Sequence, residues 1–241
     1  MIKTDFKFEY TSTDTPERYP VIIVAAGSSS RMKGINKQFF EVGGMPVIAR
    51  TMTAFENSAL ISRIVLVTKA EFIADIQKIA SKYNISKLTD VVEGGNDRFS
   101  SVINGLNCIN DGEKKVLIHD GARPFVNSMV IGNVCAALQN FDAVVCAVPL
   151  KDTIKTVNDD GTVKNTLDRS KIFSIQTPQG VDVELYKNAV AKITDTSVIT
   201  DDASVMELSG YSVKIVDGDY KDIKITTPED MILAEAFLKG E

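Results

Sequence analysis

Two cations, Arg31 and Lys37, follow a short apolar run that ends in three small residues. The stretch reads PVIIVAAGSSSRMKGINKQ, so Ala25, Ala26 and Gly27 separate the apolar run from the two charges. Small side chains let backbone N–H groups approach a ligand, and consecutive amides in a turn bind anions. The stretch has neither the Walker A nor the GxGxxG spacing. It therefore indicates either another type of phosphate-binding loop or a solvated loop.

A Gly-Gly turn follows a later apolar run, in the sequence EGGNDRFSS. This turn would offer backbone donors, and a flat nucleotide base could lie on its two glycines. Ser101 is placed to bond the edge of that base. The alternative is a cluster of polar residues that only caps the following helix.

The sequence KKVLIHDGARPF places an acid, Asp120, at the carboxyl end of an apolar run. A carboxylate beside a phosphate loop is a typical ligand for Mg²⁺. Arg123 could instead hold Asp120 in a structural ion pair. His119, the single histidine of the chain, precedes the acid. Strand alternation points these two side chains to opposite faces, so we expect His119 to be a packed residue.

Two polar stretches near the end of the chain complete the candidate residues. Lys224 lies between two isoleucines in DIKIT, which predicts a strand over Ile223–Ile225. A lysine in such a strand is usually an exposed edge residue, but it could also join Arg31 and Lys37 in a ring of cations. The sequence TDDAS, at 200–204, reads as a helix N-terminus whose polar residues cap the helix.

Short β-branched runs alternate with helical patterns along the first 150 residues, which predicts βαβ units and an α/β fold. We expect a Rossmann-like, mostly parallel twisted sheet flanked by helices, with ligands at the carboxyl ends of its strands. The predicted strands are Val21–Ala25, Ile64–Thr68, Asp90–Val92, Val116–His119, Ala143–Val148 and Val213–Val216. The predicted helices are Pro46–Asn57, Glu71–Tyr83, Arg98–Ile109, Met129–Leu138, Val183–Lys192, Asp202–Leu208 and one beginning at Thr227-Pro228.

The alternation breaks after Pro149, where an Asn-Asp-Asp-Gly turn separates two strand-like stretches. That pattern predicts a protruding β-hairpin arm over residues 151–176, and the arm would need another subunit to pack against. We treat 1–241 as a single domain, because neither a repeat nor a low-complexity segment divides it. Residues 1–18 are a polar N-terminal extension.

Composition narrows the function classes. The 241 residues carry a formal net charge of −5, with 44% hydrophobic and 24% charged residues, as in ordinary globular proteins. We expect no nucleic-acid partner, because no basic excess is present, and no membrane partner, because no apolar run reaches a span. The start of the chain lacks a signal peptide pattern, so we expect a cytoplasmic protein in which the three cysteines are reduced.

Seven of these stretches occur together and in the order AAGSSSRM…NKQF, EGGNDRFSSV, IHDGARPF, PLKDTIK, LDRSKIFSIQTPQ, TDDASVME and DIKITTPEDM. In residues and spacing this set resembles the 2-C-methyl-D-erythritol 4-phosphate cytidylyltransferases, a family of the nucleotidyltransferase superfamily. The resemblance covers residues 20 to 238. It implies transfer of CMP from CTP to a sugar-alcohol phosphate with release of pyrophosphate, assisted by Mg²⁺ or another divalent cation.

The resemblance also implies roles for individual residues. Arg31, Lys37 and Lys224 would be catalytic and would stabilise the charged phosphates. The nucleotide would bind to Ala25, Ala26, Gly27, Gly95, Asn96 and Ser101, and the metal to Asp120. The sugar-alcohol phosphate would bind to Asp152, Thr153, Arg169, Thr177, Thr200 and Asp201. Because the family's arm reaches into the neighbouring site, the enzyme would be a homodimer with exchanged arms.

Three other functions compete with this expectation. A ribitol 5-phosphate cytidylyltransferase would share the CTP motifs, but the arm sequence LDRSKIFSIQTPQ favours the methylerythritol type. A sugar-phosphate nucleotidylyltransferase for another base, or a nucleotide-binding protein without catalysis, would also fit the fold. The chain departs from the common family pattern at Ser28–Ser30, Asn36, Asn96 and Gly121, which affects loop closure and cytosine contact rather than the reaction class.

Overall fold

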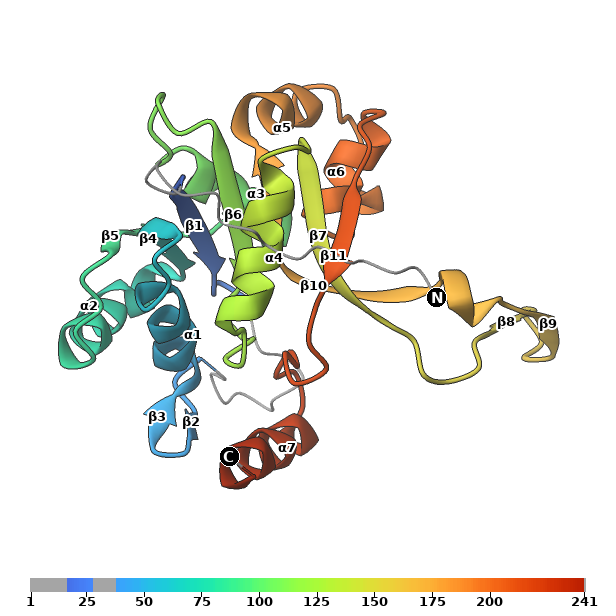
Figure 1. The fold of residues 1–241 in the computed structure, drawn as a ribbon, viewed down its shortest axis with the longest axis horizontal. Helices are drawn as coiled ribbons and strands as arrows, with labels where there is room; N and C mark the ends of the chain where they lie inside the picture. The colour runs from blue at the N-terminus through green and yellow to red at the C-terminus, as the bar shows by residue number, and fades with distance from the viewer. Residues whose placement is uncertain (1–16, 28–37, 241) are drawn as a thin grey trace.

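The computed structural model describes residues 17–27 and 38–240 (Figure 1). Its centre is a seven-stranded sheet in the order β11-β7-β10-β6-β1-β4-β5. The strands of this sheet are β1 (Tyr19–Val24), β4 (Ile61–Thr68), β5 (Leu88–Glu93), β6 (Lys115–Asp120), β7 (Ala143–Pro149), β10 (Phe173–Asp182) and β11 (Lys214–Asp217). Because β1 pairs in parallel with β4 and β6, the tips of these strands meet at one edge.

The predicted α/β fold with a mostly parallel sheet is confirmed, with one strand that the sequence did not indicate. β10 runs antiparallel between β6 and β7. Its pairing with β7 is interrupted between Ile175 and Gln179, around Pro178. Proline has no N–H to donate to a ladder and glycine weakens a strand interior, so FSIQTPQGVD does not read as a central strand.

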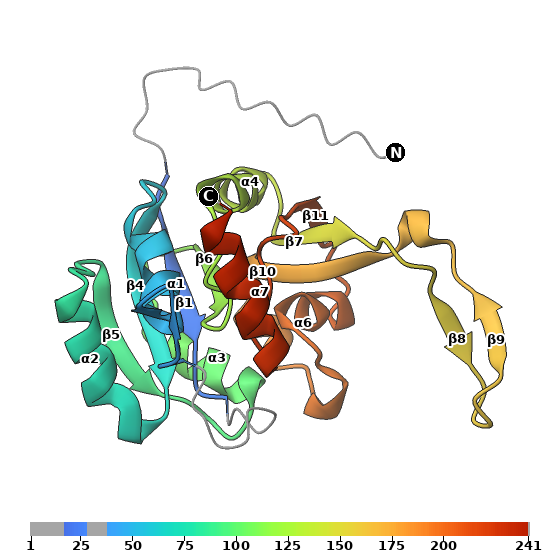
Figure 2. The same cartoon turned by 90° about the horizontal axis from the view of Figure 1, so that it is seen from below.

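Helices cover both faces of the sheet (Figure 2). All the predicted helices are present, with ends within three residues of those expected. None of the described helices is long and apolar enough to cross a membrane. The helices are α1 (Val47–Glu56), α2 (Ile73–Lys82), α3 (Arg98–Leu106), α4 (Ser128–Leu138), α5 (Val183–Val190), α6 (Asp202–Leu208) and α7 (Pro228–Lys239), with short 3₁₀ turns at 70–72, 169–171 and 196–198.

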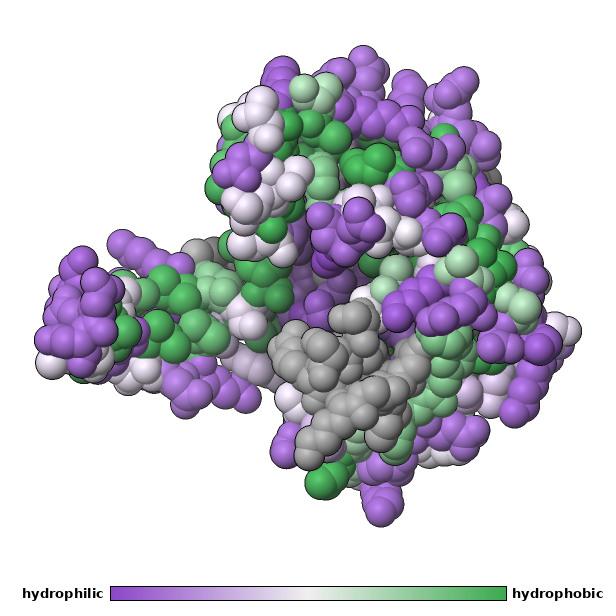
Figure 3. All heavy atoms as spheres, turned by 180° about the vertical axis from the view of Figure 1, so that it is seen from behind, coloured by the Kyte–Doolittle hydropathy of each residue, from purple (hydrophilic) through white to green (hydrophobic). Residues whose placement is uncertain are grey.

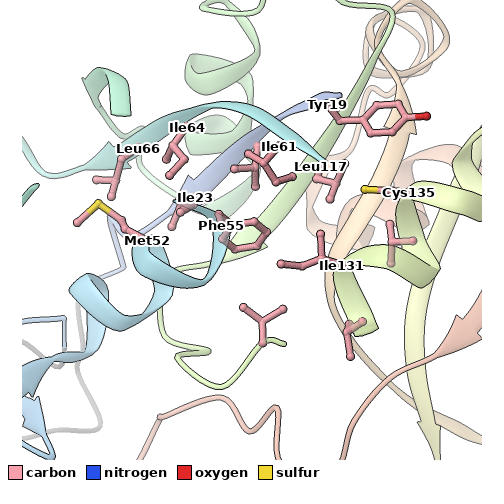
Figure 4. Close-up of a cluster of buried hydrophobic side chains, with 14 of the residues drawn as sticks. Tyr19, Ile23, Met52, Phe55, Ile61, Ile64, Leu66, Leu117, Ile131 and Cys135 are labelled. Carbon is pink, nitrogen blue, oxygen red and sulfur yellow. The ribbon is translucent and has the colours of Figure 1, made fainter. Parts of the chain in front are cut away.

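Two apolar layers form because successive residues of the central strands point to opposite faces. On one face, Ile23 of β1 packs with Met52 and Phe55 of α1 and with residues of α2 and α4 (Figure 4). On the other face, Ile22 packs with helices α3, α5 and α6. Because β1 is buried over its whole length, its tip is held rigidly at the centre of the edge.

The strand predicted at Ile223–Ile225 is wrong. Residues 218–227 form an irregular segment between β11 and α7. Ile225 is fully buried in a small cluster with α7, and its N–H donates to the carbonyl of Ala122 at 2.8 Å. One extended turn anchored by a buried isoleucine gives the same alternation of residue types as a strand, without a ladder of hydrogen bonds.

The predicted arm is present as a separate two-stranded sheet that extends away from the body (Figures 1 and 2). It consists of β8 (Lys155–Val157) and β9 (Val163–Thr166), joined by a turn with Gly161 at φ +83°. Residues 173–176, which we included in the arm, begin β10 and lead into the main sheet. One more small hairpin, β2 (Glu41–Val42) with β3 (Met45–Pro46), precedes α1.

Candidate active site

A cavity of about 860 Å³ lies at the carboxyl ends of β1, β5 and β6. Figure 3 shows a hollow lined by hydrophilic side chains in the middle of this face. Seven of the residues predicted from the sequence line it, namely Ala26, Gly27, Gly95, Asn96, Ser101, Asp120 and Lys224. Strand tips that are far apart in the sequence therefore converge, as expected for an open α/β sheet.

The Gly-Gly turn is shaped by contacts that leave no space for side chains. A Cβ on Gly94 would overlap Ala26, and a Cβ on Gly95 would overlap Ser100. The tips of β1 and β5 are therefore in direct contact at the wall of the cavity. The Gly94 N–H donates to the Thr68 carbonyl at 2.7 Å and the Gly95 N–H to the Ser101 hydroxyl at 3.1 Å, so neither glycine offers the free backbone donor that the sequence predicted.

Residues at the start of α3 hold the Gly94–Gly95 turn in place. The Asp97 side chain accepts from the Ser100 N–H at 2.7 Å, and together they form a capping box. The Ser101 hydroxyl donates to the Asp97 carbonyl at 2.7 Å and accepts from the Gly95 N–H at 3.1 Å. The residues therefore cap the helix and line the cavity at the same time, so the two interpretations of EGGNDRFSS are compatible.

Asp120 is the acidic centre of the cavity. Its carboxylate lies 2.7 Å from the Lys224 ammonium, 3.0 Å from the Arg98 guanidinium and 3.8 Å from that of Arg123. Burial disfavours the charged form, but Arg98 and Lys224 outweigh it and hold the pKa of Asp120 well below its usual range. The carboxylate is therefore ionised. Arg123, the partner considered from the sequence, is the most distant of the three cations.

Arg98 belongs to the site although it was not predicted. Its guanidinium bridges Asp120 of β6, at 3.0 Å, and Asp202 of α6, at 2.6 Å. The two carboxylates raise the pKa of Arg98 despite its burial. Tyr186 donates to the same Asp202 at 3.3 Å. A cation in the first turn of a helix opposes the helix dipole, and this was the signal that could have singled Arg98 out.

His119 is a packed residue, as expected. Its ring is fully buried, edge-on to Phe55 at 4.8 Å. Its Nδ1 lies 3.0 Å from the Thr177 hydroxyl and its Nε2 lies 3.2 Å from the Arg123 carbonyl. Burial lowers the pKa of His119 to about 3, so the ring is neutral at any working pH.

Several residues predicted to contact substrate lie behind the cavity wall instead of lining it. Ala25 is buried, and Thr177 is 4% exposed with its hydroxyl accepting from the Asp120 N–H at 3.0 Å. Asp201 caps α6 and also accepts from the Gln179 amide at 2.9 Å, and Thr200 lies exposed beside it. In this structure Thr177 and Asp201 position neighbouring groups, and a direct contact with substrate stays a prediction.

The arm residues are also outside the cavity. Asp152, Thr153 and Arg169 are exposed, and Arg169 donates to the Lys151 carbonyl at 2.8 Å. The two remaining predicted cations, Arg31 and Lys37, lie outside the described residues. Lys69 lines the cavity but was not singled out from the sequence.

A metal ion at this site would have to be bound by the protein and by a bound substrate together. The described residues contain no group of three or more His, Cys, Asp or Glu side chains that could hold a metal. A single ionised carboxylate in a cavity does fit Mg²⁺, because this ion is usually bound by one or two carboxylates together with substrate phosphates. Asp120, the metal ligand predicted from the sequence, lines this cavity together with the carboxylates of Glu71, Glu93 and Asp97.

Sequence relatives share almost the whole chain. The profile of the 2-C-methyl-D-erythritol 4-phosphate cytidylyltransferase family matches residues 20–240. Proteins with this name from Halalkalibacterium halodurans and Clostridium novyi are each 43% identical over 222 residues, which are 91% of this chain and 96% of each relative.

Solved structures agree with the sequence relatives. The crystal structure of 4-diphosphocytidyl-2C-methyl-D-erythritol synthase from Anaerococcus prevotii superposes with a TM-score of 0.81 at 33% identity, covering 93% of this chain and 97% of that one. A cytidylyltransferase structure from Thermus thermophilus gives 0.75 at 29% identity, covering 92% and 99%. The family match, the identity of the relatives over almost the whole chain and the common fold lead to one conclusion: the chain belongs to the 2-C-methyl-D-erythritol 4-phosphate cytidylyltransferase family.

Proposed function

We propose that this protein transfers CMP from CTP to 2-C-methyl-D-erythritol 4-phosphate and releases pyrophosphate. The product is 4-diphosphocytidyl-2-C-methyl-D-erythritol, an isoprenoid precursor. The observation that carries this proposal is the meeting of a glycine-rich turn suited to a base with the Asp120–Lys224 pair in one cavity. The base would lie on the glycine-rich turn, and the triphosphate and the attacking phosphate would lie beside Asp120 and Lys224.

In the proposed reaction, an oxygen of the substrate phosphate attacks the α-phosphorus of CTP. A new P–O bond forms as the bond to the leaving pyrophosphate breaks. Gly95, Asn96 and Ser101 would hold cytosine, and Lys224 would neutralise charge that develops at the α-phosphorus. Arg31 and Lys37 are proposed to act on the same triphosphate. No general base is required, because a phosphate monoester is already anionic at pH 7.

The divalent cation is part of this proposal. Asp120 would hold Mg²⁺ together with phosphate oxygens of the nucleotide. When bound, the ion would reduce the negative charge of the triphosphate.

We also propose a homodimer in which each arm completes the partner's site. Val157 and Val163 on the arm are 60% and 59% exposed, and the arm has no apolar core of its own. Figure 3 shows hydrophobic side chains on the arm between its mostly hydrophilic tip and the body. Thr153 and Arg169 would grip the sugar-alcohol phosphate across the dimer, and Asp152, Thr177, Thr200 and Asp201 would line its pocket. Residues 1–241 are proposed to act as one domain, located in the cytoplasm.

The test is pyrophosphate release from CTP with 2-C-methyl-D-erythritol 4-phosphate and with ribitol 5-phosphate, in parallel. We expect turnover with the first and at least tenfold lower kcat/KM with the second. Preference for ribitol 5-phosphate would assign the chain to the competing activity, that of a ribitol 5-phosphate cytidylyltransferase. Turnover with neither substrate would favour a nucleotide-binding protein without catalysis.

A further inference from the structure

The segment that carries Lys224 has no regular secondary structure of its own. Residues 218–227 link β11 to α7 without joining the sheet. Yet the Lys224 ammonium lies 2.7 Å from Asp120, with its side chain 38% exposed. A position this well defined has to be imposed by neighbouring elements.

One buried side chain, Gln176 of β10, holds the turn that precedes Lys224. Its amide nitrogen donates to the carbonyls of Asp219, at 2.7 Å, and Asp222, at 3.2 Å. Its amide oxygen accepts from the Asp219 N–H at 3.2 Å. Gln176 is 6% exposed, so all of these bonds are shielded from water. A carboxamide is the only neutral side-chain group that can both donate to two carbonyls and accept an N–H here.

The backbone around Gln176 is shaped to allow this approach. A Cβ on Gly218 would overlap the amide oxygen of Gln176 and lie 3.2 Å from the Ala147 backbone. The Gly218 N–H itself donates to the Ala147 carbonyl at 2.9 Å. A glycine therefore precedes the turn at the point where the carboxamide and β7 leave no space for a side chain.

A second contact joins the same turn to the acidic centre. The Asp222 carbonyl accepts from Arg123 at 2.7 Å as well as from Gln176. Three residues later, the Ile225 N–H donates to the Ala122 carbonyl at 2.8 Å. Lys224 is thus held between two backbone anchors, of which the Asp222 carbonyl is bound by both Arg123 and Gln176.

From these contacts we infer that Gln176 is a positioning residue of the reaction, which acts by fixing the Asp219–Asp222 turn and thereby the ammonium of Lys224. Gln176 also lies at the root of the arm, where β10 enters the sheet. It does not touch the cavity. The inference rests on the proposed function, since it assigns a rate effect to the lysine.

The primary experiment compares Gln176→Glu with wild type in the pyrophosphate-release assay. Glutamate has the same length, but it places an oxygen where the Gln176 amide nitrogen donates to the two carbonyls. The carbonyl oxygens would repel that oxygen. Small displacements of catalytic groups can cost about 10²-fold in rate. We expect kcat to fall between about tenfold and 10²-fold, while KM for CTP changes less than about threefold. Gln77→Glu on the exposed face of α2 makes the same chemical change and should leave both constants unchanged.

A double-mutant cycle separates positioning from general destabilisation. If Gln176 acts through Lys224, Gln176→Glu should lower kcat much less in a Lys224→Ala background than in wild type. Equal factors in the two backgrounds, or a loss confined to KM for CTP, would overturn the inference. Gln176→Met, which keeps the side-chain length without charge, replaces Gln176→Glu if the latter does not fold. If Lys224→Ala leaves no measurable rate, the cycle is run with Lys224→Arg.

The same assay keeps the two proposals apart. Absence of turnover in the wild-type protein would contradict the proposed function. Normal wild-type turnover with additive substitutions would leave that function standing and reject only the role of Gln176.

Discussion

The cavity at the strand tips and the protruding arm are organised in opposite ways. In the cavity, Asp120 is held by partners from several segments of the chain, namely Arg98, Lys224 and Thr177. In the arm, the hydrogen bonds run between β8 and β9 or within their turn, and the side chains are exposed. The difference indicates that the nucleotide half is assembled within one chain, whereas the arm gains its function from what it packs against.

The comparison also separates two kinds of catalytic contribution. Groups held rigidly by the protein can stabilise a transition state without reorganisation. Groups on an exposed hairpin contribute to binding once a partner orders them. Substitutions in the cavity should therefore act mainly on kcat and on stability, and substitutions in the arm mainly on the KM for one substrate.

The largest effect is expected from Lys224→Ala. Loss of the cation beside Asp120 should lower kcat by about 10² to 10³-fold, the range for removing one preorganised charge-stabilising group. The fold should survive, since the side chain is 38% exposed. Steady-state kinetics and circular dichroism would measure the two effects. A folded variant with near-normal kcat would remove Lys224 from the proposed mechanism.

Arg98→Ala should produce the next largest effect, on stability. It removes the ion-pair partner of Asp202 and one of the three cations around Asp120, whose side chains are only 2% and 10% exposed. Breaking a buried ion pair on one side costs about 3 kcal/mol of unfolding free energy. Urea denaturation would measure it against Lys78→Ala, which breaks an exposed pair with Asp75 and should cost under about 0.5 kcal/mol. Equal losses of unfolding free energy in the two variants would mean that the ion pairs of Arg98 stabilise the fold no more than an exposed surface pair does.

Arg169→Ala tests the arm. We expect KM for the sugar-alcohol phosphate to rise about tenfold, because a charge-assisted contact to phosphate is lost, while KM for CTP stays the same. Lys164→Ala removes another exposed cation, on β9, and serves as the matched control. A change confined to the KM for CTP would contradict the proposal that the arm binds the sugar-alcohol phosphate.

Asp222→Asn should have the smallest effect and a defined pH dependence. Burial raises the pKa of Asp222 to about 8, with Arg123 opposing and Asp120 and Asp219 reinforcing the shift. An unfolded aspartate has a pKa of about 3.9, so between pH 4 and pH 8 the folded state binds more protons and stability falls as pH rises. Asparagine removes that loss. We expect the Asp222→Asn variant to be more stable than wild type at pH 8, by a difference that vanishes near pH 4.

Thermal or urea unfolding of both proteins across this pH range would measure the difference. Stabilisation that is the same at pH 4 and pH 8 would contradict a protonated Asp222. A constant penalty at every pH would mean that the carboxyl makes contacts which an amide cannot replace.

The sequence predicted the strand tips well because their physics is local. Buried β-branched runs end at Ala26 and Asp120, and the turn at Gly95 carries glycines that only a close approach explains. Arg98 was missed because its importance depends on partners 22 and 104 residues away. Gln176 was missed for the same reason, since its bonds join β10 to a turn over 40 residues later.

The arm shows the other limit of sequence reasoning. Its Asn-Asp-Asp-Gly turn marked the hairpin, but the strand that follows it was hidden by Pro178 and Gly180. These residues are tolerated in β10 because buried polar side chains on either side of Pro178 replace missing ladder bonds with bonds to Asp120, Asp201 and the Lys224 segment. Such compensation is visible only once the neighbouring strands are in place.

The separate sheet formed by β8 and β9 makes the hairpin an exchangeable module. Its residues contribute no bond to the register of the seven-stranded sheet, which re-forms from Phe173 onward. The hairpin could therefore be shortened, lengthened or replaced without shifting any strand that carries the nucleotide-binding tips. Because Thr153 and Arg169 lie outside β8 and β9, such changes would also leave in place the residues proposed to grip the sugar-alcohol phosphate.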